Sequence, residues 1–385
     1  MKLVGNPARA LLVAWSIVLP SAAPAAIHTV GPGESISATL QRVDPGDIVR
    51  LTGTEYHENL VIEVPITLVG IGMPVIRGGY QGNVVHILAP GTRIQGVHVS
   101  EMRNPEAPRV AIIEHPDIRR MLLMMKAFTE GMRALLYTTA FFADLAECSE
   151  DEAERNKYHG FVELLTPVCK AWPSDMGFRV TEWAMQCYGG YGYCADYPAE
   201  QYMRDIKITS IYEGTNGIQA MDLLGRKVSM GGGKLFMNFL ALLGEFIEKH
   251  KSHATLGDCV GRLEKAKDTL AHVTIDFAKT GASGDMVYPV LNACCYLEMF
   301  GDVMVAYLLL GEAVIAREKF DAICGEKNAD TEEARKSLCE EDDEARFYWG
   351  KLCSAEFFTT QILPRVNARA ESIESGSRSA LEVVF

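Results

Sequence analysis

The sequence predicts a mainly α-helical protein whose helices follow a short fragment of parallel β-helix type. Between residues 27 and 102, short runs of Val, Ile and Leu alternate with Gly, Asn and Pro, which is typical of strands and turns. From residue 109 onward, apolar residues recur every three or four positions, which is the period of a helix. The composition changes at the same place: residues 1–100 hold six basic and six acidic residues, and all ten cysteines lie at or beyond Cys148.

The N-terminus has the three parts of a secretory signal peptide, which we place at residues 1–26. Lys2 and Arg9 supply positive charge, residues 10–19 are apolar, and residues 22–26 are small residues suited to cleavage. An incidental apolar N-terminus is the alternative. A signal peptide implies a periplasmic location. The ten cysteines lack the regular spacing of a disulfide framework, so they indicate reduced thiols and a cytoplasmic location for the helical part.

Residues 27–102 are predicted to form rungs of a parallel β-helix. Such rungs bury their apolar face only by stacking on one another, and about three repeats are needed for stability. This segment holds about two, so we expect it to be poorly stable alone. Its Val30-Gly31-Pro32-Gly33 turn and its Pro45-Gly46-Asp47 turn before a strand resemble the opening of right-handed β-helix proteins, in particular the periplasmic maturation proteins of nitrous oxide reductase. No site residue is assigned here.

Apolar periodicity predicts the helices of the remaining chain. In order, these are residues 117–148, residues 156–188, a short helix after Pro198, residues 215–230, and several amphipathic helices between residues 234 and 370. Asp117 is predicted to cap the first helix. Pro173 removes one backbone hydrogen bond, so we expect a kink or break in the second. Gly231–Gly233 is predicted to be the hinge between two helical domains, residues 109–230 and residues 234–385.

Several functional classes are disfavoured. The net charge of −13 argues against a nucleic-acid binder, which needs a basic face for the phosphate backbone. The neighbouring cysteines Cys294 and Cys295 have no further metal ligands at useful spacing, so no metal site is predicted. The glycines before Lys234 are not a phosphate-binding loop, because Val228 and Leu235 stand where that motif needs Gly and Ser or Thr.

The most informative stretch runs from Gln186 to Gln219. Its three pieces are Gln186-Cys187-Tyr188-Gly189-Gly190-Tyr191-Gly192-Tyr193, Tyr197-Pro198 with Met203-Arg204-Asp205, and Ile211-Tyr212-Glu213-Gly214-Thr215-Asn216-Gly217-Ile218-Gln219. A glycine cluster alone indicates only a helix end. Together the pieces resemble the C-terminal signature of acyl-CoA dehydrogenases, over about residues 109–385. Residues 115–122 and the last segment resemble the subgroup with an extra C-terminal helical domain, which includes the methylthiopropanoyl-CoA dehydrogenases.

The residue types suit the chemistry that this resemblance implies. Oxidation of a saturated acyl thioester removes an α-proton and a β-hydride, and the weakly acidic α-proton needs a carboxylate base held close in a dry pocket. Glu213 lies on a tight turn before a helix, and Gly214 lets the backbone come close to a ligand. A carboxylate favoured by a helix N-terminus is the simpler interpretation of Glu213.

The resemblance implies a role for each residue of the signature. Glu213 is expected to be the catalytic base, with its backbone N–H helping to polarise the thioester carbonyl, and Tyr212 is expected beside the acyl pocket. The other expected contacts are with FAD, in the family often across subunits: Thr215 and Gly217 at the flavin, and Gln186 and Gly190 at the dinucleotide part. The implied substrate is an acyl-CoA, the electron acceptor is electron-transferring flavoprotein, and the assembly is a homo-oligomer.

The family also has an N-terminal helical domain and a middle β-domain, which supply most of the flavin site, and residues 1–108 match neither. A fusion, a gene-prediction or assembly joint near residue 100, or a decayed remnant would each explain this. We therefore expect the chain to bind FAD weakly or not at all on its own. Two other functions stay open: a non-catalytic helical oligomerisation module fused to a secreted β-helix fragment, and a secreted β-helix protein with a helical appendage. The adjacent pair Arg204-Asp205 is interpreted as a structural ion pair, and Trp172 and Trp183 as core.

Overall fold

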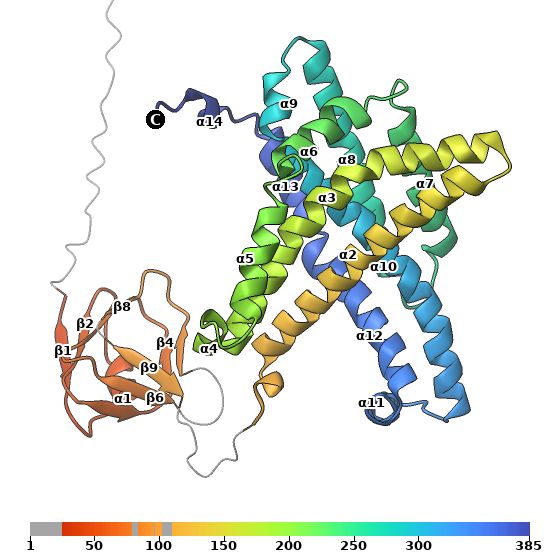
Figure 1. The fold of residues 1–385 in the computed structure, drawn as a ribbon. Coiled ribbons are helices and arrows are strands. Elements are labelled where there is room, and N and C mark those ends of the chain that lie inside the picture. Colours follow the sequence, from red (N-terminus) through yellow and green to blue (C-terminus); the bar gives the residue numbers. More distant parts are fainter. Residues whose placement is uncertain (1–24, 79–83, 96, 102–109) are drawn as a thin grey trace, which may run out of the picture. The chain divides into compact units, whose positions relative to one another are not determined.

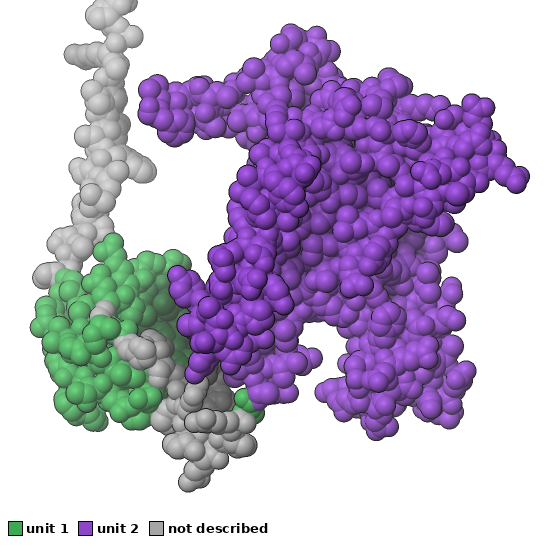
Figure 2. All heavy atoms as spheres, viewed as in Figure 1, with its two compact units in different colours: residues 1–110 green, residues 111–385 purple. Residues whose placement is uncertain are grey.

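The computed structural model describes residues 25–78, 84–95, 97–101 and 110–385. The chain divides into two compact units, residues 1–110 (unit 1) and residues 111–385 (unit 2), which are coloured separately in Figure 2. The predicted signal peptide, residues 1–26, lies outside the described residues except for its last two positions.

Unit 1 is built from short strands and one small helix (Figure 1). Its elements are β1 (Ile27–Val30), α1 (Ile36–Leu40), β2 (Ile48–Leu51), β3 (Glu55–His57), β4 (Leu60–Ile62), β5 (Thr67–Gly70), β6 (Val75–Gly78), β7 (Val85–Ile87), β8 (Arg93–Gln95) and β9 (His98–Glu101). In the described part of this unit, the strands form three parallel sheets with the orders β1-β2-β5-β8, β3-β6-β9 and β4-β7. Because β2, β3 and β4 lie in different sheets and β5, β6 and β7 repeat the series, the chain coils as a parallel β-helix, as predicted.

Apolar side chains stack from one turn of this coil to the next. Val49 of β2 is in register with Leu68 of β5, and Leu68 is in register with Ile94 of β8. Val49 and Leu68 are completely buried. Each turn therefore covers the apolar face of its neighbour, which is how a solenoid forms a core. The resemblance of this unit to periplasmic maturation proteins stays a prediction.

Unit 2 is helical (Figure 1). Its α-helices are α2 (Pro116–Cys148), α3 (Glu152–Tyr188), α4 (Gly190–Tyr193), α5 (Ala199–Thr209), α6 (Asn216–Asp222), α7 (Lys234–His250), α8 (Gly257–Ala282), α9 (Val287–Leu291), α10 (Ala293–Glu326), α11 (Glu332–Glu341), α12 (Asp343–Phe357), α13 (Arg365–Glu374) and α14 (Ser379–Glu382). A 3-10 turn at Ile112–Glu114 precedes α2, and π-helical segments at Leu223–Lys227 and Phe358–Ile362 continue α6 and α12. All ten cysteines lie in this continuously described unit and are free thiols.

The core of unit 2 lies around α10, against which α2, α8 and α12 pack. α10 is long and apolar enough to cross a membrane, but 67% of its most apolar stretch is buried inside the unit, so it is the central core helix of this fold. Gly301 of α10 lies directly against Trp172 of α3, because a Cβ atom at Gly301 would come within 2.2 Å of the indole Cδ1. The Trp172 side chain is completely buried, as predicted, and Trp183 packs partly buried against the same core.

The two predicted helical domains share this one core. The ring of Phe128 on α2 lies 5.7 Å from that of Trp172 and 5.8 Å from that of Phe358, which follows α12. Gly231–Gly233 is a turn between the π-helical segment and α7, and all three of its residues have the positive φ angles that glycine adopts most easily. The glycines therefore change the direction of the chain inside one packed unit.

The expected cap at Asp117 was wrong, and of the kink or break expected at Pro173 the break does not occur. α2 begins at Pro116 with His115 as its N-cap, so Asp117 lies in the first turn, since proline is well suited to the first helical position. α3 continues through Pro173 without a break. The neighbouring Trp172 is anchored in the core, and this packing outweighs the one backbone hydrogen bond that the proline removes.

The interpretation of Arg204 and Asp205 as an ion pair was also wrong. The guanidinium of Arg204 instead lies 2.9 Å from the carboxylate of Glu200, one turn earlier on α5. Residues four apart share a helix face, whereas adjacent residues point in different directions, so the helical geometry selects Glu200.

Candidate functional site

The turn between α5 and α6 has an unusual backbone. Glu213 has a φ of +56° and Gly214 a φ of +81°. A left-handed φ is uncommon for a residue with a side chain and costs about 1–2 kcal/mol. Such a conformation persists only where the surrounding structure holds it, and residues of this kind cluster at functional sites. The sequence placed Glu213 on a tight turn before a helix, and the structure has it there.

Hydrogen bonds close this turn onto α6. The backbone N–H of Asn216 donates to the carbonyl of Ser210 at 3.1 Å, and Gln219 Nε2 donates to the carbonyl of Glu213 at 3.4 Å. Thr215 is the N-cap of α6, and its Oγ1 accepts from the N–H of Ile218. In the residues that the structure describes, the backbone N–H of Glu213 donates to no protein acceptor, so it is available to a ligand.

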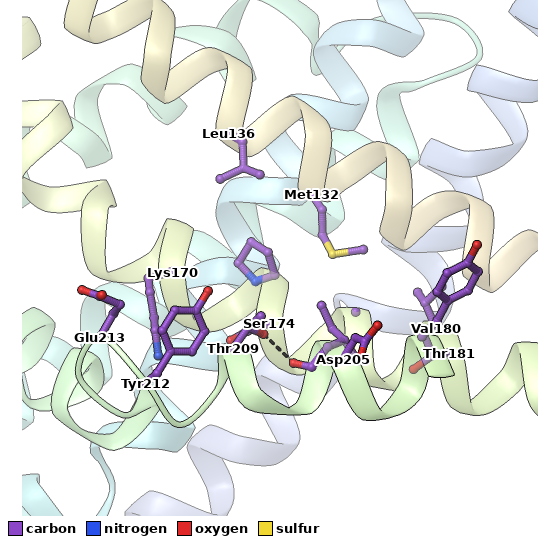
Figure 3. Close-up of a pocket in the computed structure, with 14 residues that line it drawn as sticks. Met132, Leu136, Lys170, Ser174, Val180, Thr181, Asp205, Thr209, Tyr212 and Glu213 are labelled. Carbon is purple, nitrogen blue, oxygen red and sulfur yellow. Dashed lines mark hydrogen bonds between the residues drawn. The ribbon is translucent and has the colours of Figure 1, made fainter. Parts of the chain in front are cut away.

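Glu213 and Tyr212 lie at one end of a groove of about 800 Å³. The groove is bounded by α2, α3, α5 and the turn, and its lining is largely apolar: Met132, Leu136, Lys170, Pro173, Ser174, Gly177, Val180, Thr181, Tyr202, Asp205, Ile206, Thr209, Tyr212 and Glu213. Figure 3 shows Glu213 and Lys170 near one end and Val180 and Thr181 near the other. An apolar groove that ends at a carboxylate can receive an elongated apolar ligand whose reactive end lies at Glu213.

Lys170 supplies the positive charge at this end of the groove. Its Nζ donates to Asn216 Oδ1 at 2.9 Å. Burial lowers the pKa of Lys170, and the nearby carboxylates of Asp175 and Glu213 partly offset this effect. Within the described part of the chain, Glu213 itself forms no ion pair with any cation. Its carboxylate thus interacts electrostatically with Lys170 and is exposed at the outer end of the groove (Figure 3).

The structure brings four of the six predicted site residues together. Tyr212 and Glu213 line the groove, with Tyr212 half-exposed, and Thr215 and Gly217 follow at once in the cap and first turn of α6. A Cβ atom added at Gly217 would meet only the hydroxyl of Thr215, at 3.8 Å, so the backbone there is open to approach.

Gln186 and Gly190 lie at the far end of α3. Asn216 contacts α3 at Ser174, and Gln186 is twelve residues further along that helix, which corresponds to about 18 Å. Both residues are exposed, and a Cβ atom at Gly190 would meet nothing within 4 Å. Gly190 begins the short helix α4 instead of lying in a loop. Within one chain, the two residues predicted to contact the dinucleotide part of FAD, Gln186 and Gly190, therefore lie far from the Glu213 turn.

Three residues at the site were missed by the sequence analysis: Lys170, Ser174 and Asn216. The side chains of Lys170 and Asn216 meet although the residues are 46 positions apart in the chain. The only local signal was a Lys and a Ser four residues apart on one helix face, which by itself indicates a solvated face.

Comparison with known families identifies the class of protein. Residues 87–228 match the model of the acyl-CoA dehydrogenase C-terminal domain, and residues 239–383 match that of the acetyl-CoA dehydrogenase C-terminal-like family. The chain belongs to the acyl-CoA dehydrogenase family, of which it carries these two C-terminal regions. The resemblance inferred from the signature between Gln186 and Gln219 is thereby confirmed.

Individual relatives agree with this assignment. The chain is 33% identical over 287 residues to a butyryl-CoA dehydrogenase of Syntrophomonas wolfei, covering 74% of this chain and 44% of the relative. It is 33% identical to the broad-specificity linear acyl-CoA dehydrogenase FadE5 of Mycobacterium tuberculosis, covering 76% and 46%. It is 32% identical to the 3-methylmercaptopropionyl-CoA dehydrogenase of Ruegeria pomeroyi, covering 71% and 43%. The chain thus spans a little under half the length of these relatives.

The fold agrees as well. The Caenorhabditis elegans protein ACDH-11, solved in complex with C11-CoA, superposes with a TM-score of 0.51 at 17% sequence identity, covering 70% of this chain and 42% of that one. At this identity the likeness shows the fold of the helical part alone.

Proposed function

We propose that this chain is the catalytic C-terminal part of an FAD-dependent acyl-CoA dehydrogenase, in which Glu213 removes the α-proton of an acyl-CoA thioester. The observation that carries the proposal is the position of Glu213 on a left-handed turn at the end of an apolar groove. The relatives named above, each called an acyl-CoA dehydrogenase, support the same reaction type.

The chemistry divides between the carboxylate and the cofactor. In this proposal the carboxylate of Glu213 accepts the α-proton. Its backbone N–H, which has no acceptor among the described residues, donates to the thioester carbonyl, where negative charge develops. FAD, when bound, supplies the acceptor for the β-hydride. The substrate thereby loses one proton and one hydride and gains a double bond between Cα and Cβ. Tyr212 and the apolar lining of the groove contact the acyl group in this proposal.

The predicted FAD contacts fit the cofactor in two separate parts. Thr215 and Gly217 are accessible beside Glu213, and Gly217 has no side chain to block a flat ring. Gln186 and Gly190 are exposed at the other end of α3 and suit a second FAD held mainly by a neighbouring copy. We therefore propose a homo-oligomer in which each cofactor touches two chains, with electron-transferring flavoprotein as the electron acceptor.

The experiment uses the purified chain with excess FAD and butyryl-CoA or a longer straight-chain acyl-CoA. We expect the flavin absorbance to bleach and the α,β-unsaturated thioester to form, as measured by spectrophotometry and mass spectrometry. Glu213→Gln removes the base and is expected to slow the reaction about 10²–10⁴-fold. Glu371→Gln, an exposed carboxylate on α13 outside the groove, is the matched control and should react at the native rate.

The same experiment separates the alternative functions. A non-catalytic oligomerisation module, or a secreted β-helix protein with a helical appendage, predicts no product and no effect of Glu213→Gln. If product forms equally fast with Glu213→Gln, or not at all with the native chain at saturating FAD, the proposal for this chain is wrong.

A further inference from the structure

One side chain ties the Glu213 turn to α3. The amide of Asn216 accepts a hydrogen bond from Lys170 Nζ at 2.9 Å through Oδ1. Through Nδ2 it donates to Ser174 Oγ at 2.8 Å and to the carbonyl of Ala171 at 3.2 Å. Both donors and the acceptor of the amide are thus used by α3. In the part of the chain that the structure describes, the hydrogen bonds between the segment from Ser210 to Gln219 and α3 all pass through this residue.

These contacts are specific to the site and are not a requirement of the helix that Asn216 begins. The N-cap of α6 is Thr215, whose hydroxyl already accepts the N–H of Ile218. The side chain of Asn216 leaves α6 altogether and reaches residues 42 to 46 positions earlier in the chain. Its partner Ser174 is buried, and its own hydroxyl donates onward to the carbonyl of Ala171 at 2.9 Å. The same hydroxyl also lies 3.2 Å from Asn216 Oδ1, so Ser174 and Asn216 contact each other through both polar atoms of the amide.

The hydrogen bonds of Asn216 to α3 lie close to the residue with the least favourable backbone conformation in this turn. Glu213, three residues before Asn216, holds a left-handed φ, and a strained residue stays so only while its surroundings fix it. Two other hydrogen bonds hold the turn: the backbone N–H of Asn216 donates to the carbonyl of Ser210 at 3.1 Å, and Gln219 Nε2 donates to the carbonyl of Glu213 at 3.4 Å. The same amide also holds the Lys170 ammonium at the end of the groove where Glu213 lies.

We propose that Asn216 is a positioning residue, which fixes the Glu213 turn and the Lys170 ammonium relative to each other at the end of the groove. The role of Glu213 as base rests on the proposed function, whereas the effect of Asn216 on the turn does not. Asn216 acts through Glu213 and touches no reacting atom. The change that tests it is Asn216→Ala, with Gln219→Ala as the matched control, because both remove an amide that contacts the turn.

The first measurement is amide hydrogen exchange of the native chain and its variants, followed by mass spectrometry. Asn216→Ala is expected to speed exchange of the hydrogen-bonded amides at Ile211, Tyr212 and residue 216 about tenfold, the effect of losing one or two net hydrogen bonds, without changing exchange in α10. Gln219→Ala is expected to change it less than about threefold, because its hydrogen bond is long and exposed. Lys170→Met removes only one of the three residues that Asn216 contacts on α3, so its effect on turn exchange should be intermediate. It provides a milder variant should Asn216→Ala fail to fold.

The second measurement is the exchange of the acyl-CoA α-proton for deuterium in D₂O, which reports on the base. Asn216→Ala should lower the maximal rate about tenfold and leave KM unchanged, and Glu213→Gln should abolish exchange. If Asn216→Ala leaves both turn exchange and rate at native values while Glu213→Gln is inactive, the positioning role is wrong and the proposed function stands. If Glu213→Gln retains the rate, the proposed function is wrong, and faster turn exchange in Asn216→Ala still supports the positioning role.

Discussion

Two faces of α3 carry polar side chains and use them in opposite ways. On the face toward α10, the indole of Trp172 donates to Asp302 at 3.0 Å, and Asp302 accepts from Arg369 at 2.7 Å, with all three groups in or at the edge of the core. On the face toward the groove, Ser174 and Lys170 meet Asn216 beside open space. The comparison shows that one helix can anchor a fold and present a site, because the two functions need opposite degrees of burial.

The buried face is expected to dominate stability. Trp172→Ala removes a completely buried indole and leaves Asp302 without one of its partners. We expect it to lower the free energy of unfolding of unit 2 by about 3–5 kcal/mol, measured by denaturant unfolding followed by circular dichroism. Tyr193→Ala, which truncates an aromatic side chain that is 80% exposed, is the control and should change it by less than about 0.5 kcal/mol. Equal effects of the two variants would contradict the assignment of Trp172 to the core.

The buried face should also make stability depend on pH. Burial raises the pKa of Asp302 to about 6 from its ordinary value of 3.8, and the attraction of Arg369 and the hydrogen bond from Trp172 only partly oppose this. Since the folded state then holds the proton more tightly than the unfolded state, this group favours folding below about pH 4. That contribution is lost as the pH rises through about 6.

Asp302→Asn tests this dependence. The variant cannot titrate, so its unfolding free energy between pH 4 and pH 7 should fall less steeply than that of the native chain, as measured by denaturant unfolding across that range. Asp285→Asn is a control of the same type, because Asp285 is an Asp paired with an Arg outside the core, and Arg378 lowers its pKa. If the unfolding free energy of Asp302→Asn falls with pH as steeply as that of the native chain, other groups set the pH dependence.

The groove face is expected to matter less for stability and more for function. Ser174→Ala removes the acceptor of Asn216 Nδ2 and should cost about 1 kcal/mol in unfolding free energy. Its effect on turn exchange should not add to that of Asn216→Ala, because the two side chains hydrogen-bond to each other, and the double variant measures this directly. Additive effects would mean that Ser174 and Asn216 act on the turn independently.

Much of the fold could be predicted from local sequence. Apolar periodicity predicted a helix over residues 117–148, which the structure has at Pro116–Cys148, and Phe128 and Leu135 of this helix are completely buried. The short runs of residues 27–102 predicted strands of a parallel β-helix. Both predictions succeed because helical and strand periods are properties of neighbouring residues. Asp117 misled because proline is favoured at a helix start, and no break occurs at Pro173 because tertiary packing outweighs its local tendency.

The sequence by itself determined the family and the place of Glu213, because three short pieces between Gln186 and Gln219 identify the signature and a glycine after a carboxylate predicts a tight turn. Only the tertiary structure decided what holds that turn and what lies at its ends. Asn216 reaches Lys170 across 46 positions, Trp172 reaches Asp302 across 130, and α3 separates Gln186 and Gly190 from Glu213. Such contacts depend on how helices pack, and packing joins residues whose separation along the chain carries no signal in a single sequence.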